Sequence, residues 1–582
     1  MPAPAPFTPP PRWVWRPDAH TEPSTPIHST EDGAWAAALT AAPALVAGWW
    51  LQHHPWPLAP WLYSPAGIAT AAGAAALGAA AGWLAVRTPH DRICHLAGPR
   101  LLEGHAAERG AVAWSRAQGG TPRNTRLHPR VPLPDRQWAR HMLVHGSVGS
   151  GKTQILASVV RQVSADARSR LLLADSKGDW TAMLPDAALL CPWDARSAVW
   201  AIADEIRSPA DCASVAQALI PEHPDPKARF WTATSRAVVE AALRTLHTER
   251  SAAWGWRELR DVLRMPAKQI VETCQRHHPE IAQVLGGGET TSGGVLATVA
   301  ADTRLVAVCA QAWPEVPQDT AQRWSVRHWL SRGCAGLPRH TVVQTGADQG
   351  ASRALLGLVT TLTARRMLAP SMPESPERVR VWIVLDELAA AGRLDDLPAL
   401  IERGRSKGVA LLAGVQDLEQ IAAIYGRETA SGLSGMVGAQ VVCQIGPGPS
   451  RDRVADLIGK RRVAVPAHST QGGATGRTSH TKSVHEESRA LVLPAQMSSC
   501  LGPWHNAGAG FVRALVLPSG ADACVLDWPV IPLAVKRTPF VPAAWTRPGA
   551  KQPLMVDAPV TQPLASAASG GRVVDAVIRF PG

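Results

Sequence analysis

Residues 141–156, HMLVHGSVGSGKTQIL, contain the pattern that decides the fold of this chain. A short apolar run leads into a glycine-rich turn that ends in Gly151, Lys152 and Thr153, and a helical pattern follows over 153–167. The turn fits the phosphate-binding loop GxxxxGK[ST] at every fixed position, and the strand before it and the helix after it are the context that this loop requires. The stretch therefore predicts an α/β fold with a nucleoside triphosphate site.

Phosphate chemistry explains the residue types in this loop. Glycines let backbone N–H groups wrap around phosphate oxygens, and the N-terminus of the following helix adds a partial positive charge. We expect Lys152 to reach the β- and γ-phosphates and Thr153 to be a ligand of Mg²⁺. The expected nucleotide-binding residues are Gly146, Ser147, Val148, Gly149, Ser150, Gly151, Lys152 and Thr153.

A second buried strand, VWIVL (381–385), ends in two carboxylates, Asp386 and Glu387. Open α/β sheets bind ligands at the C-terminal ends of their strands, so both carboxylates fit the same nucleotide site. We expect Asp386 to hold Mg²⁺ through its water shell and Glu387 to polarise the attacking water as a general base. An ordinary core strand with exposed acids at its end would leave the same pattern.

The spacing of these motifs predicts an insertion. Lys152 and Asp386 are 234 residues apart, more than a compact nucleotide-binding fold needs between these two strands. Helical patterns dominate residues 200–330 and β-branched runs are few there, so we expect an inserted all-α domain. The nucleotide-binding domain then comprises 139–199 and 331–536.

Two polar residues beyond the acidic strand are further candidates for the site. Arg405 lies near the end of the next helical pattern and fits an arginine finger supplied to a neighbouring subunit, although a solvated helix face would also place an arginine there. Gln416 ends the next buried strand, where an amide can sense the γ-phosphate or position water. An ordinary turn residue is the alternative for Gln416.

A window without Asp, Glu, Lys or Arg extends from Gly33 to Val86. Within it, 34–52 and 66–86 each approach the ~20 residues that cross ~30 Å of hydrocarbon as a helix. Tryptophans lie near their ends and arginines follow the second segment, which predicts a two-helix membrane anchor over 34–87 with a short periplasmic loop and cytoplasmic termini. A signal peptide fits less well, because the first segment starts late. Two buried Ala-rich helices of a soluble domain remain the other alternative.

The remaining segments have the composition of connections. The Pro-rich residues 1–33 predict a disordered cytoplasmic N-terminus, and the basic, turn-rich residues 88–138 predict a linker. A Ser/Thr/Gly/His-rich stretch, 466–489, predicts a flexible loop, and the Pro/Ala-rich residues 537–582 predict a weakly ordered tail.

The net charge indicates which class of partner the chain could bind, and the cysteine content indicates the redox state of its compartment. Residues 87–582 carry 57 Lys and Arg against 43 Asp and Glu, an excess that favours a polyanion such as nucleic acid. Charge scattered over a solvated surface would give the same total. Nine dispersed cysteines without a CxxC pair predict neither a disulfide framework nor a zinc site, as expected in a reducing compartment.

Taken together, seven phrases of the sequence resemble the type IV coupling proteins of bacterial conjugation, with the closest similarity to the TraD/TraG branch, which is TrwB-like. The similarity is strong over about 130–460 and concerns the membrane anchor in layout only. The phrases, in the order and spacing of that family, are HMLVHGSVGSGKT (141–153), DSKGDW (175–180), CPWDARS (191–197), ARFWTATSRAVVEAAL (228–243), VWIVLDELAAAGRLDDLPALIERGRSKG (381–408), GVQDLEQIAAIYG (414–426) and ASGL (430–433).

The resemblance implies a RecA-like motor domain, an inserted all-α domain facing the cytoplasm and an anchor in the inner membrane. It implies a homohexameric ring that hydrolyses ATP with Mg²⁺, receives a relaxase–DNA complex and passes it to the channel of a type IV secretion system. The family's phosphate-loop lysine, Walker B pair, arginine finger and strand-end glutamine correspond to Lys152, Asp386 with Glu387, Arg405 and Gln416. The chain departs from the family in having CPW (191–193) where an FNP-like phrase is usual, and in its short C-terminal tail.

The sequence thus predicts a multi-pass inner-membrane coupling ATPase that moves DNA largely without regard to its sequence. One alternative is a receptor for protein effectors, in which ATP binding serves assembly and the helical insertion docks the cargo. The other is an FtsK-like chromosome translocase, although such chains usually carry four membrane helices and a C-terminal winged domain.

Overall fold

The computed structural model describes residues 94–547, apart from 224, 318, 320–322, 332–336, 473–477 and 507–508, together with 72–73 and 76–77. The expected disordered N-terminus (1–33) and first membrane segment (34–52) lie outside the described residues, as does the second (66–86) apart from those four. Among the described residues no single helix is long and apolar enough to cross a membrane. One bent pair, α13 (Glu289–Asp302) and α14 (Arg304–Ala312), meets the criteria of length and composition only when its two helices, 54° apart, are counted together.

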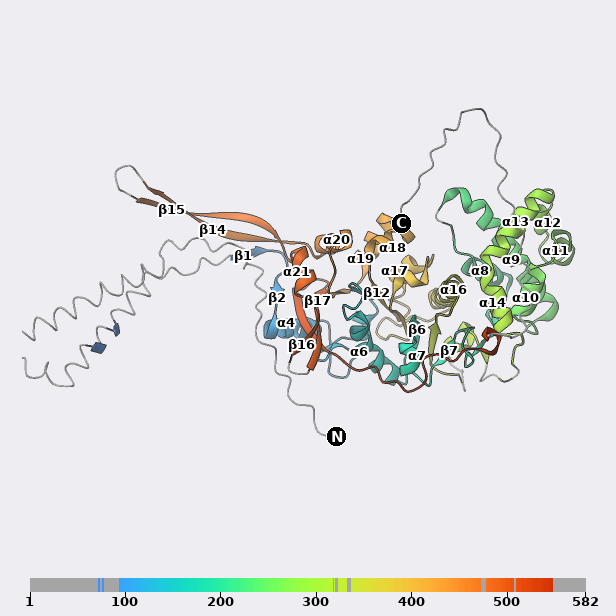
Figure 1. The fold of residues 1–582 in the computed structure, drawn as a ribbon, viewed down its shortest axis with the longest axis horizontal. Coiled ribbons are helices and arrows are strands. Elements are labelled where there is room, and N and C mark those ends of the chain that lie inside the picture. Colours follow the sequence, from blue (N-terminus) through green and yellow to red (C-terminus); the bar gives the residue numbers. More distant parts are fainter. Residues whose placement is uncertain are drawn as a thin grey trace, which may run out of the picture.

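An 11-stranded sheet forms the centre of the molecule, in the order β2-β18-β17-β13-β5-β12-β11-β6-β10-β7 with β16 beside β17 (Figure 1). Its strands from β13 to β7 run parallel to one another, so their C-terminal ends share one edge. The parallel strands are β13 (Ala439–Val442), β5 (Met142–His145), β12 (Val409–Val415), β11 (Val381–Leu385), β6 (Arg170–Asp175), β10 (His340–Gln344) and β7 (Ala188–Leu190).

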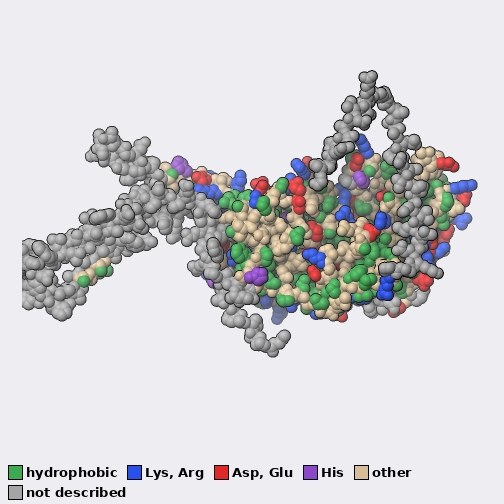
Figure 2. Space-filling view, in the orientation of Figure 1, with side chains coloured by type: hydrophobic (Ala, Val, Ile, Leu, Met, Phe, Trp, Pro, Cys, Tyr) green, Lys and Arg blue, Asp and Glu red, His purple; other side chains and the backbone are tan. Residues whose placement is uncertain are grey.

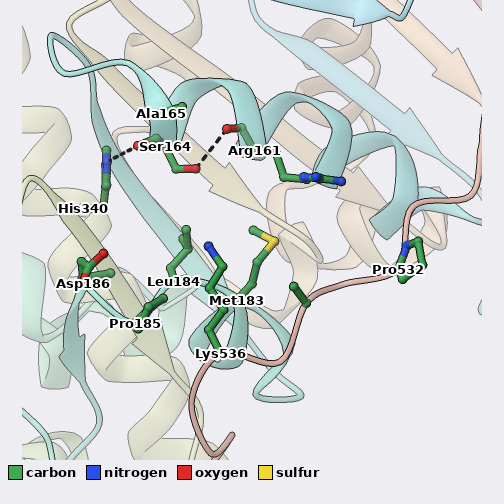
Figure 3. Close-up of a pocket in the computed structure, with 12 residues that line it drawn as sticks. Arg161, Ser164, Ala165, Met183, Leu184, Pro185, Asp186, His340, Pro532 and Lys536 are labelled. Atoms are coloured by element: carbon green, nitrogen blue, oxygen red, sulfur yellow. Dashed lines mark hydrogen bonds between the residues drawn. The ribbon is translucent and has the colours of Figure 1, made fainter. Parts of the chain in front are cut away.

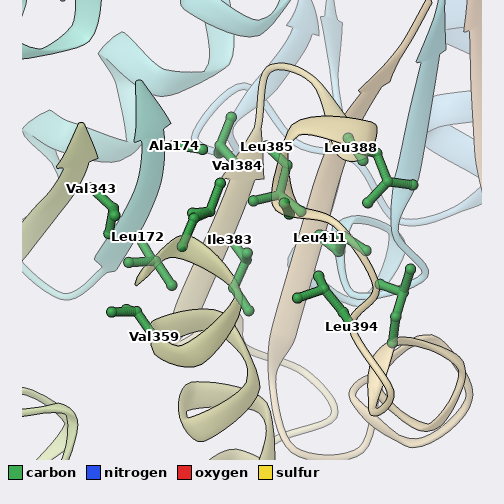
Figure 4. Close-up of a cluster of buried hydrophobic side chains, with 14 of the residues drawn as sticks. Leu172, Ala174, Val343, Val359, Ile383, Val384, Leu385, Leu388, Leu394 and Leu411 are labelled. Carbon is green, nitrogen blue, oxygen red and sulfur yellow. The ribbon is translucent and has the colours of Figure 1, made fainter. Parts of the chain in front are cut away.

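The parallel strands are buried on both faces because helices cover them. Every residue of β11 and β12 is buried, which explains their continuous apolar sequences. Figure 4 shows Leu172 and Ile383 of the sheet together with Val359 of a covering helix. The helices and turns around the sheet are α6 (Lys152–Ala165), α7 (Asp179–Met183), α16 (Gln349–Leu368), η3 (Leu388–Ala391), α17 (Leu397–Arg403), α18 (Leu418–Tyr425), α19 (Arg427–Met436), α20 (Pro449–Ile458) and α21 (Pro494–Ser499).

Antiparallel strands extend one side of the sheet. They are β17 (Ala509–Pro518), β18 (Ala523–Pro529) and β16 (Gly502–Asn506), and β18 carries the two-residue β2 (Leu101–Leu102) in parallel on its outer edge. Residues 88–138, expected as a linker, contain packed elements in their described part. These are β1 (Cys94–Ala97), α4 (Gly104–Ala117), β3 (Arg126–His128), β4 (Val131–Pro132) and α5 (Asp135–Trp138).

The described part of the expected linker is folded because it has partners far away in the sequence. The indole Nε1 of Trp528 donates to the carbonyl oxygen of Leu127 at 2.9 Å. Helix α4 packs on β18, and its buried apolar residues are Ala107, Ala111 and Trp114. These apolar residues recur at helical spacing, a signal that the turn-forming residues around them obscure.

The stretch 466–489, expected as a flexible loop, instead contributes to a long hairpin. β14 (Lys460–Gly472) pairs with β15 (Thr478–Ala490) from Lys460 opposite Ala490 to Gly472 opposite Thr478, and β1 pairs with the start of β14. In Figure 1 this hairpin projects away from the central sheet. Thr470, Thr478, Thr481 and Val484 are β-branched residues, which favour strands, and the continuous pairing of the hairpin outweighs the loop-like overall composition.

Between β8 (Val199–Trp200) and β10 the described residues are mainly helical, with one short strand, β9 (Arg323–Trp324), which pairs in parallel with β8. We call 209–330 the helical region. It lies at one end of the molecule in Figure 1. Its helices are α8 (Pro209–Leu219), α9 (Arg229–Arg250), α10 (Trp256–Leu263), α11 (Ala267–Cys274), α12 (Ile281–Leu285), α13, α14 and α15 (Val326–Leu330), with the 3-10 turn η2 (Pro226–Ala228) among them and η1 (Ile202–Glu205) before them.

Buried tryptophans attach the helical region to the sheet. Trp200 packs edge-on against Trp256 and Trp324, with ring centroids 5.5 and 5.7 Å apart. The indole Nε1 of Trp324 donates to the Thr341 hydroxyl of β10 at 3.1 Å. The large area that such rings bury and the satisfied indole N–H groups make this a firm junction.

Residues 530–547, which we call the C-terminal strap, run past α6, α7 and β7 in Figure 1 and end in η4 (Ala544–Thr546). The weakly ordered tail expected from 537 therefore does not include 537–547, which hydrogen bonds hold to distant parts of the chain. The backbone N–H of Val541 donates to Asp194 Oδ2 at 2.9 Å, and Trp545 Nε1 donates to the carbonyl oxygen of Pro192 at 2.9 Å.

Candidate functional site

The loop 146–151 begins at the common C-terminal edge of the parallel strands. The backbone N–H of Gly146 donates to the carbonyl oxygen of Val415 at 3.0 Å, and that of Ser147 donates to the carbonyl oxygen of Gln444 at 2.8 Å. The loop thus starts between the ends of β12 and β13, the two neighbours of β5 in the sheet. Its last residue, Gly151, precedes α6, whose N-terminus faces this edge.

Steric crowding explains two of the glycines. A Cβ atom on Gly146 would lie 2.4 Å from Ser150 Oγ and 2.8 Å from Cys443 Cβ, and one on Gly151 would lie 2.5 Å from Val512 Cγ1. Gly151 also has a φ of 96°, and Gly149 a φ of 75°, in the left-handed region that favours glycine. The course of the loop therefore depends on positions that have no side chain.

The other loop residues differ in exposure. Val148 is 77% exposed at the tip of the loop, whereas Ser150 is buried beneath it. The Ser147 hydroxyl accepts a hydrogen bond from the backbone N–H of Gly446 at 2.9 Å, which ties the loop to the segment after β13. Of the predicted loop residues, Val148 alone presents its side chain largely to solvent.

The side chain of Lys152 folds back onto the backbone of the loop. Its Nζ donates to the carbonyl oxygens of Gly146 at 2.7 Å and Ser147 at 3.0 Å, which leaves one of the three ammonium protons for another acceptor. Burial lowers the pKa of Lys152, and the negative charges of Glu387 and Asp386 act in the opposite direction. A buried ammonium that donates only to neutral carbonyls is suited to bind an anion at the loop.

Thr153 and Asp386 meet although they are far apart in sequence. The Thr153 hydroxyl Oγ1 donates to Asp386 and lies 3.2 Å from each carboxylate oxygen. Burial raises the pKa of Asp386, while Thr153 and Lys152 act to lower it. A hydroxyl beside a carboxylate at the start of α6 is an oxygen donor set of the kind that Mg²⁺ prefers.

Glu387, the second of the two carboxylates after β11, lies at the same edge. Neither carboxylate oxygen has a hydrogen-bond partner in the described part of the chain, and both oxygens are buried. Burial raises the pKa of Glu387, and the Lys152 charge is the largest influence that opposes this rise. The backbone N–H groups of Ala389 and Gln416 approach this carboxylate and also lower its pKa, but neither reaches it with hydrogen-bond geometry, so its oxygens can accept a proton or a hydrogen bond from a ligand.

Gln416 lies at the same edge. It follows β12 directly, whose last residue Val415 pairs in register with His145 of β5. The neighbouring Gly414 passes so near β11 that a Cβ atom on it would lie 2.0 Å from the carbonyl oxygen of Asp386. The backbone of Gln416 is close enough to Glu387 to lower its pKa.

Arg405 lies at the opposite edge of the sheet. It is exposed in the turn that precedes β12, where its carbonyl oxygen accepts a hydrogen bond from the N–H of Gly408 at 3.2 Å. The seven residues of β12 separate it from Gln416, a distance of roughly 20 Å at ~3.3 Å per residue. The structure therefore brings Lys152, Thr153, Asp386, Glu387 and Gln416 together and keeps Arg405 away from them.

The loop 175–181 after β6 belongs to this edge and received no role from the sequence. Asp175 is 1% exposed, and its carboxylate accepts the backbone N–H groups of Lys177 at 3.2 Å, Gly178 at 2.8 Å and Thr181 at 2.7 Å. The phrase DSKGDW at the end of an apolar run was the available signal, because polar residues after a parallel strand lie at the ligand-binding edge.

A cavity of about 290 Å³ lies away from these residues (Figure 3). It is bounded by the C-terminal part of α6, the turn before β7, the start of β10 and the C-terminal strap, and His340 Nε2 lies 3.1 Å from the carbonyl oxygen of Ser164 at its wall. None of the predicted site residues lines it.

Comparison with known proteins places this geometry in context. A family model described as the type IV secretion-system coupling protein DNA-binding domain matches residues 125–514. The coupling protein TraD of Escherichia coli (strain K12) is 25% identical over 305 residues, which are 50% of this chain and 40% of TraD, so the alignment spans less than half of that relative.

Solved structures of a second relative share the fold. The bacterial conjugative coupling protein TrwBdeltaN70, in an unbound monoclinic form, superposes with a TM-score of 0.61 and 20% identity over 78% of this chain and 98% of that chain. The plasmid coupling protein TrwB in complex with ADP and Mg²⁺ gives a TM-score of 0.61 and 19% identity over 77% and 98%. These matches confirm the expected α/β class.

Proposed function

We propose a function for this chain from one premise: it belongs to the family of type IV secretion-system coupling proteins, whose DNA-binding-domain model covers residues 125–514. The chain acts as a coupling ATPase of a conjugative type IV secretion system, which recruits a relaxase–DNA complex and uses ATP hydrolysis to drive DNA transfer. The observation that carries this proposal is the meeting, at one sheet edge, of a phosphate-binding loop, the Thr153–Asp386 pair and the unpartnered Glu387.

The residues at this edge fit ATP with Mg²⁺. When bound, the nucleotide supplies the phosphoanhydride bond, and the metal neutralises charge on its phosphates. The backbone of 146–151 donates N–H groups, Lys152 adds its ammonium, and α6 adds the partial charge of its N-terminus. Thr153 and Asp386 would hold the metal, the aspartate through the metal's water shell. Gly146 and Gly151 have no room for a Cβ atom against Ser150, Cys443 and Val512, so this course of the loop requires glycine at both positions.

Glu387 has the position and the chemistry of a general base. Its oxygens are free to accept a hydrogen bond from the attacking water, and the raised pKa makes the carboxylate a better proton acceptor than an exposed glutamate. Lys152 lies close enough to oppose this rise, which favours the charged form of the carboxylate. Gln416, next to both Glu387 and the loop, would orient the water or sense the γ-phosphate.

Arg405 acts in trans in this proposal. Arg405 lies at the edge of the sheet opposite its own phosphate site. It can therefore reach a bound nucleotide only in a neighbouring copy of the chain. A homohexameric ring in which the Arg405 edge of one copy faces the phosphate site of the next supplies such a neighbour. An arginine finger of this kind contributes about 10³–10⁵ in rate in well-studied nucleotide hydrolases.

DNA is the proposed cargo, held mainly by charge. The net charge of +12 favours a phosphate backbone, and contacts of this type are largely independent of base sequence. On the face in Figure 2, Lys and Arg side chains are interspersed with acidic ones over the helical region rather than gathered in one patch. We assign to the helical region the docking of the relaxase, and to the anchor expected at 34–87 the attachment to the inner membrane and the channel.

The test is hydrolysis of ATP by the purified 582-residue chain with and without DNA. We expect DNA to stimulate hydrolysis, more strongly at low than at high salt, because phosphate contacts weaken with salt. Lys152→Ala should remove both the basal and the stimulated rates. Hydrolysis that DNA fails to stimulate at low salt, in a sample shown to be hexameric, would contradict the proposal.

A further inference from the structure

The loop after β6 presents a lysine at the phosphate site that none of the roles above uses. Lys177 is exposed, and its ammonium has no hydrogen-bond or ion-pair partner among the described residues. Its backbone, in contrast, is fixed, because the buried carboxylate of Asp175 accepts the N–H groups of Lys177, Gly178 and Thr181. The loop thus carries an exposed ammonium on a backbone whose position is fixed.

Contacts from two other segments also fix the backbone of this loop. Gly178 has a φ of 86°, and a Cβ atom on it would lie 2.9 Å from Pro539 of the C-terminal strap. The side chain of Gln344, at the end of β10, donates to the carbonyl oxygen of Pro539 at 3.0 Å. The N–H of Thr345 donates to the carbonyl oxygen of Asp175 at 2.9 Å. The loop is therefore held between β10 and the strap.

The sheet register brings this loop beside the acidic pair. β6 is the neighbour of β11, and Ala174 pairs with Leu385, so Asp175 and Asp386 are the next residues at the edge. Lys177 follows two residues later and is near enough to lower the pKa values of both Asp386 and Lys152. Lys152 at the start of α6 and Lys177 in the loop after β6 thus lie on either side of the acidic pair, at the edge where the terminal phosphate would lie.

We propose that Lys177 binds the γ-phosphate and thereby lets this site distinguish a nucleoside triphosphate from a diphosphate. The proposal rests on the nucleotide site proposed above and adds a residue to it. Lys152 donates to two loop carbonyls, and its remaining proton can serve the β- and γ-phosphates alike. Lys177 enters from the far side of Asp386, where a diphosphate has no charge to offer it.

The experiment measures equilibrium binding of ADP and of a non-hydrolysable ATP analogue, each with Mg²⁺, to the full chain. We expect Lys177→Ala to raise the Kd of the triphosphate analogue about tenfold and to change the Kd of ADP less than twofold. Lys177→Arg should restore most of the affinity for the analogue. Lys268→Ala, which removes an exposed lysine of α11 in the helical region, is the matched control and should change neither Kd.

Two outcomes would overturn this role. Equal weakening of ADP and analogue would show a general effect on the loop, and unchanged binding of both would show that Lys177 does not touch the nucleotide. Thermal unfolding of the nucleotide-free variants separates either from a folding defect. If the wild-type chain binds neither nucleotide, the proposed function fails as well, whereas normal wild-type binding with no selective loss refutes Lys177 alone.

Discussion

Replacing Glu387 by glutamine should stabilise the protein and stop its chemistry. The native carboxylate has both oxygens buried without a hydrogen-bond partner in the described part of the chain, so the folded state holds a poorly solvated charge. Burial raises its pKa above the usual 4.5, and Lys152 offsets this only in part. A glutamine has nearly the same shape and carries no charge.

The expected gain in stability is modest. An unsatisfied buried polar group costs about 1–3 kcal/mol, and more when it is charged. The glutamine amide is also unpaired, and it gives up the attraction of Lys152, so we expect a net gain of about 1 kcal/mol. For a domain of this size class that corresponds to a rise in Tm of about 2–4 °C. Loss of the proposed general base should lower kcat by about 10²–10⁴.

The raised pKa of Glu387 determines how the stability difference should change with pH. A folded pKa above the unfolded one means that ionised Glu387 destabilises the fold at high pH and that this penalty is absent below about the unfolded value of 4.5. The difference in Tm between Glu387→Gln and wild type should therefore shrink as the pH falls toward that value.

Differential scanning of the nucleotide-free chains, together with steady-state hydrolysis, measures both effects. Glu402→Gln, an exposed glutamate of α17, is the matched control and should change neither Tm nor rate. A Glu387→Gln variant that is less stable than wild type, or that hydrolyses ATP at more than a tenth of its rate, would refute this reasoning.

Two further predictions concern residues away from Glu387. Asp194→Ala should lower the free energy of unfolding by about 2–4 kcal/mol, somewhat less than for a fully buried pair, because it leaves the partly exposed Arg196 without its carboxylate and frees the N–H of Val541. Limited proteolysis should then cut within 530–547, and an uncut strap would contradict the role of Asp194. Arg405→Ala should abolish hydrolysis in the assembled protein and leave nucleotide affinity unchanged. Mixing it with Lys152→Ala should restore partial activity, since each variant keeps the half of the shared site that the other lacks, and no recovery would count against an arginine supplied in trans.

Local patterns in the sequence were sufficient to predict the residues at the centre of the candidate site. The phosphate loop, the carboxylates after 381–385 and Gln416 each follow an apolar strand directly, and parallel strands bring such positions to one edge. No contact had to be known to place them there. The position of Arg405 before β12 likewise follows from chain order, although the neighbour that would receive it does not.

Features that depend on distant partners were not predictable. The described part of the expected linker folds because Trp528 and β18 cover it, and the strap is fixed by Asp194 and Pro192 some 350 residues before it. A Pro-rich segment gives no local sign of such partners. The proposed role of Lys177 needed the same kind of knowledge, because the phrase DSKGDW marks the end of a strand but only the pairing of β6 with β11 puts that end beside Asp386.

The most direct test of the central claim is conjugative transfer from a host strain that lacks this chain. Complementation with the wild-type chain should restore transfer, whereas Lys152→Ala or Glu387→Gln, expressed at equal level, should leave it at the background of the deletion strain. Transfer by the Lys152→Ala strain at the wild-type frequency would contradict the account, because DNA would then move without the ATP site.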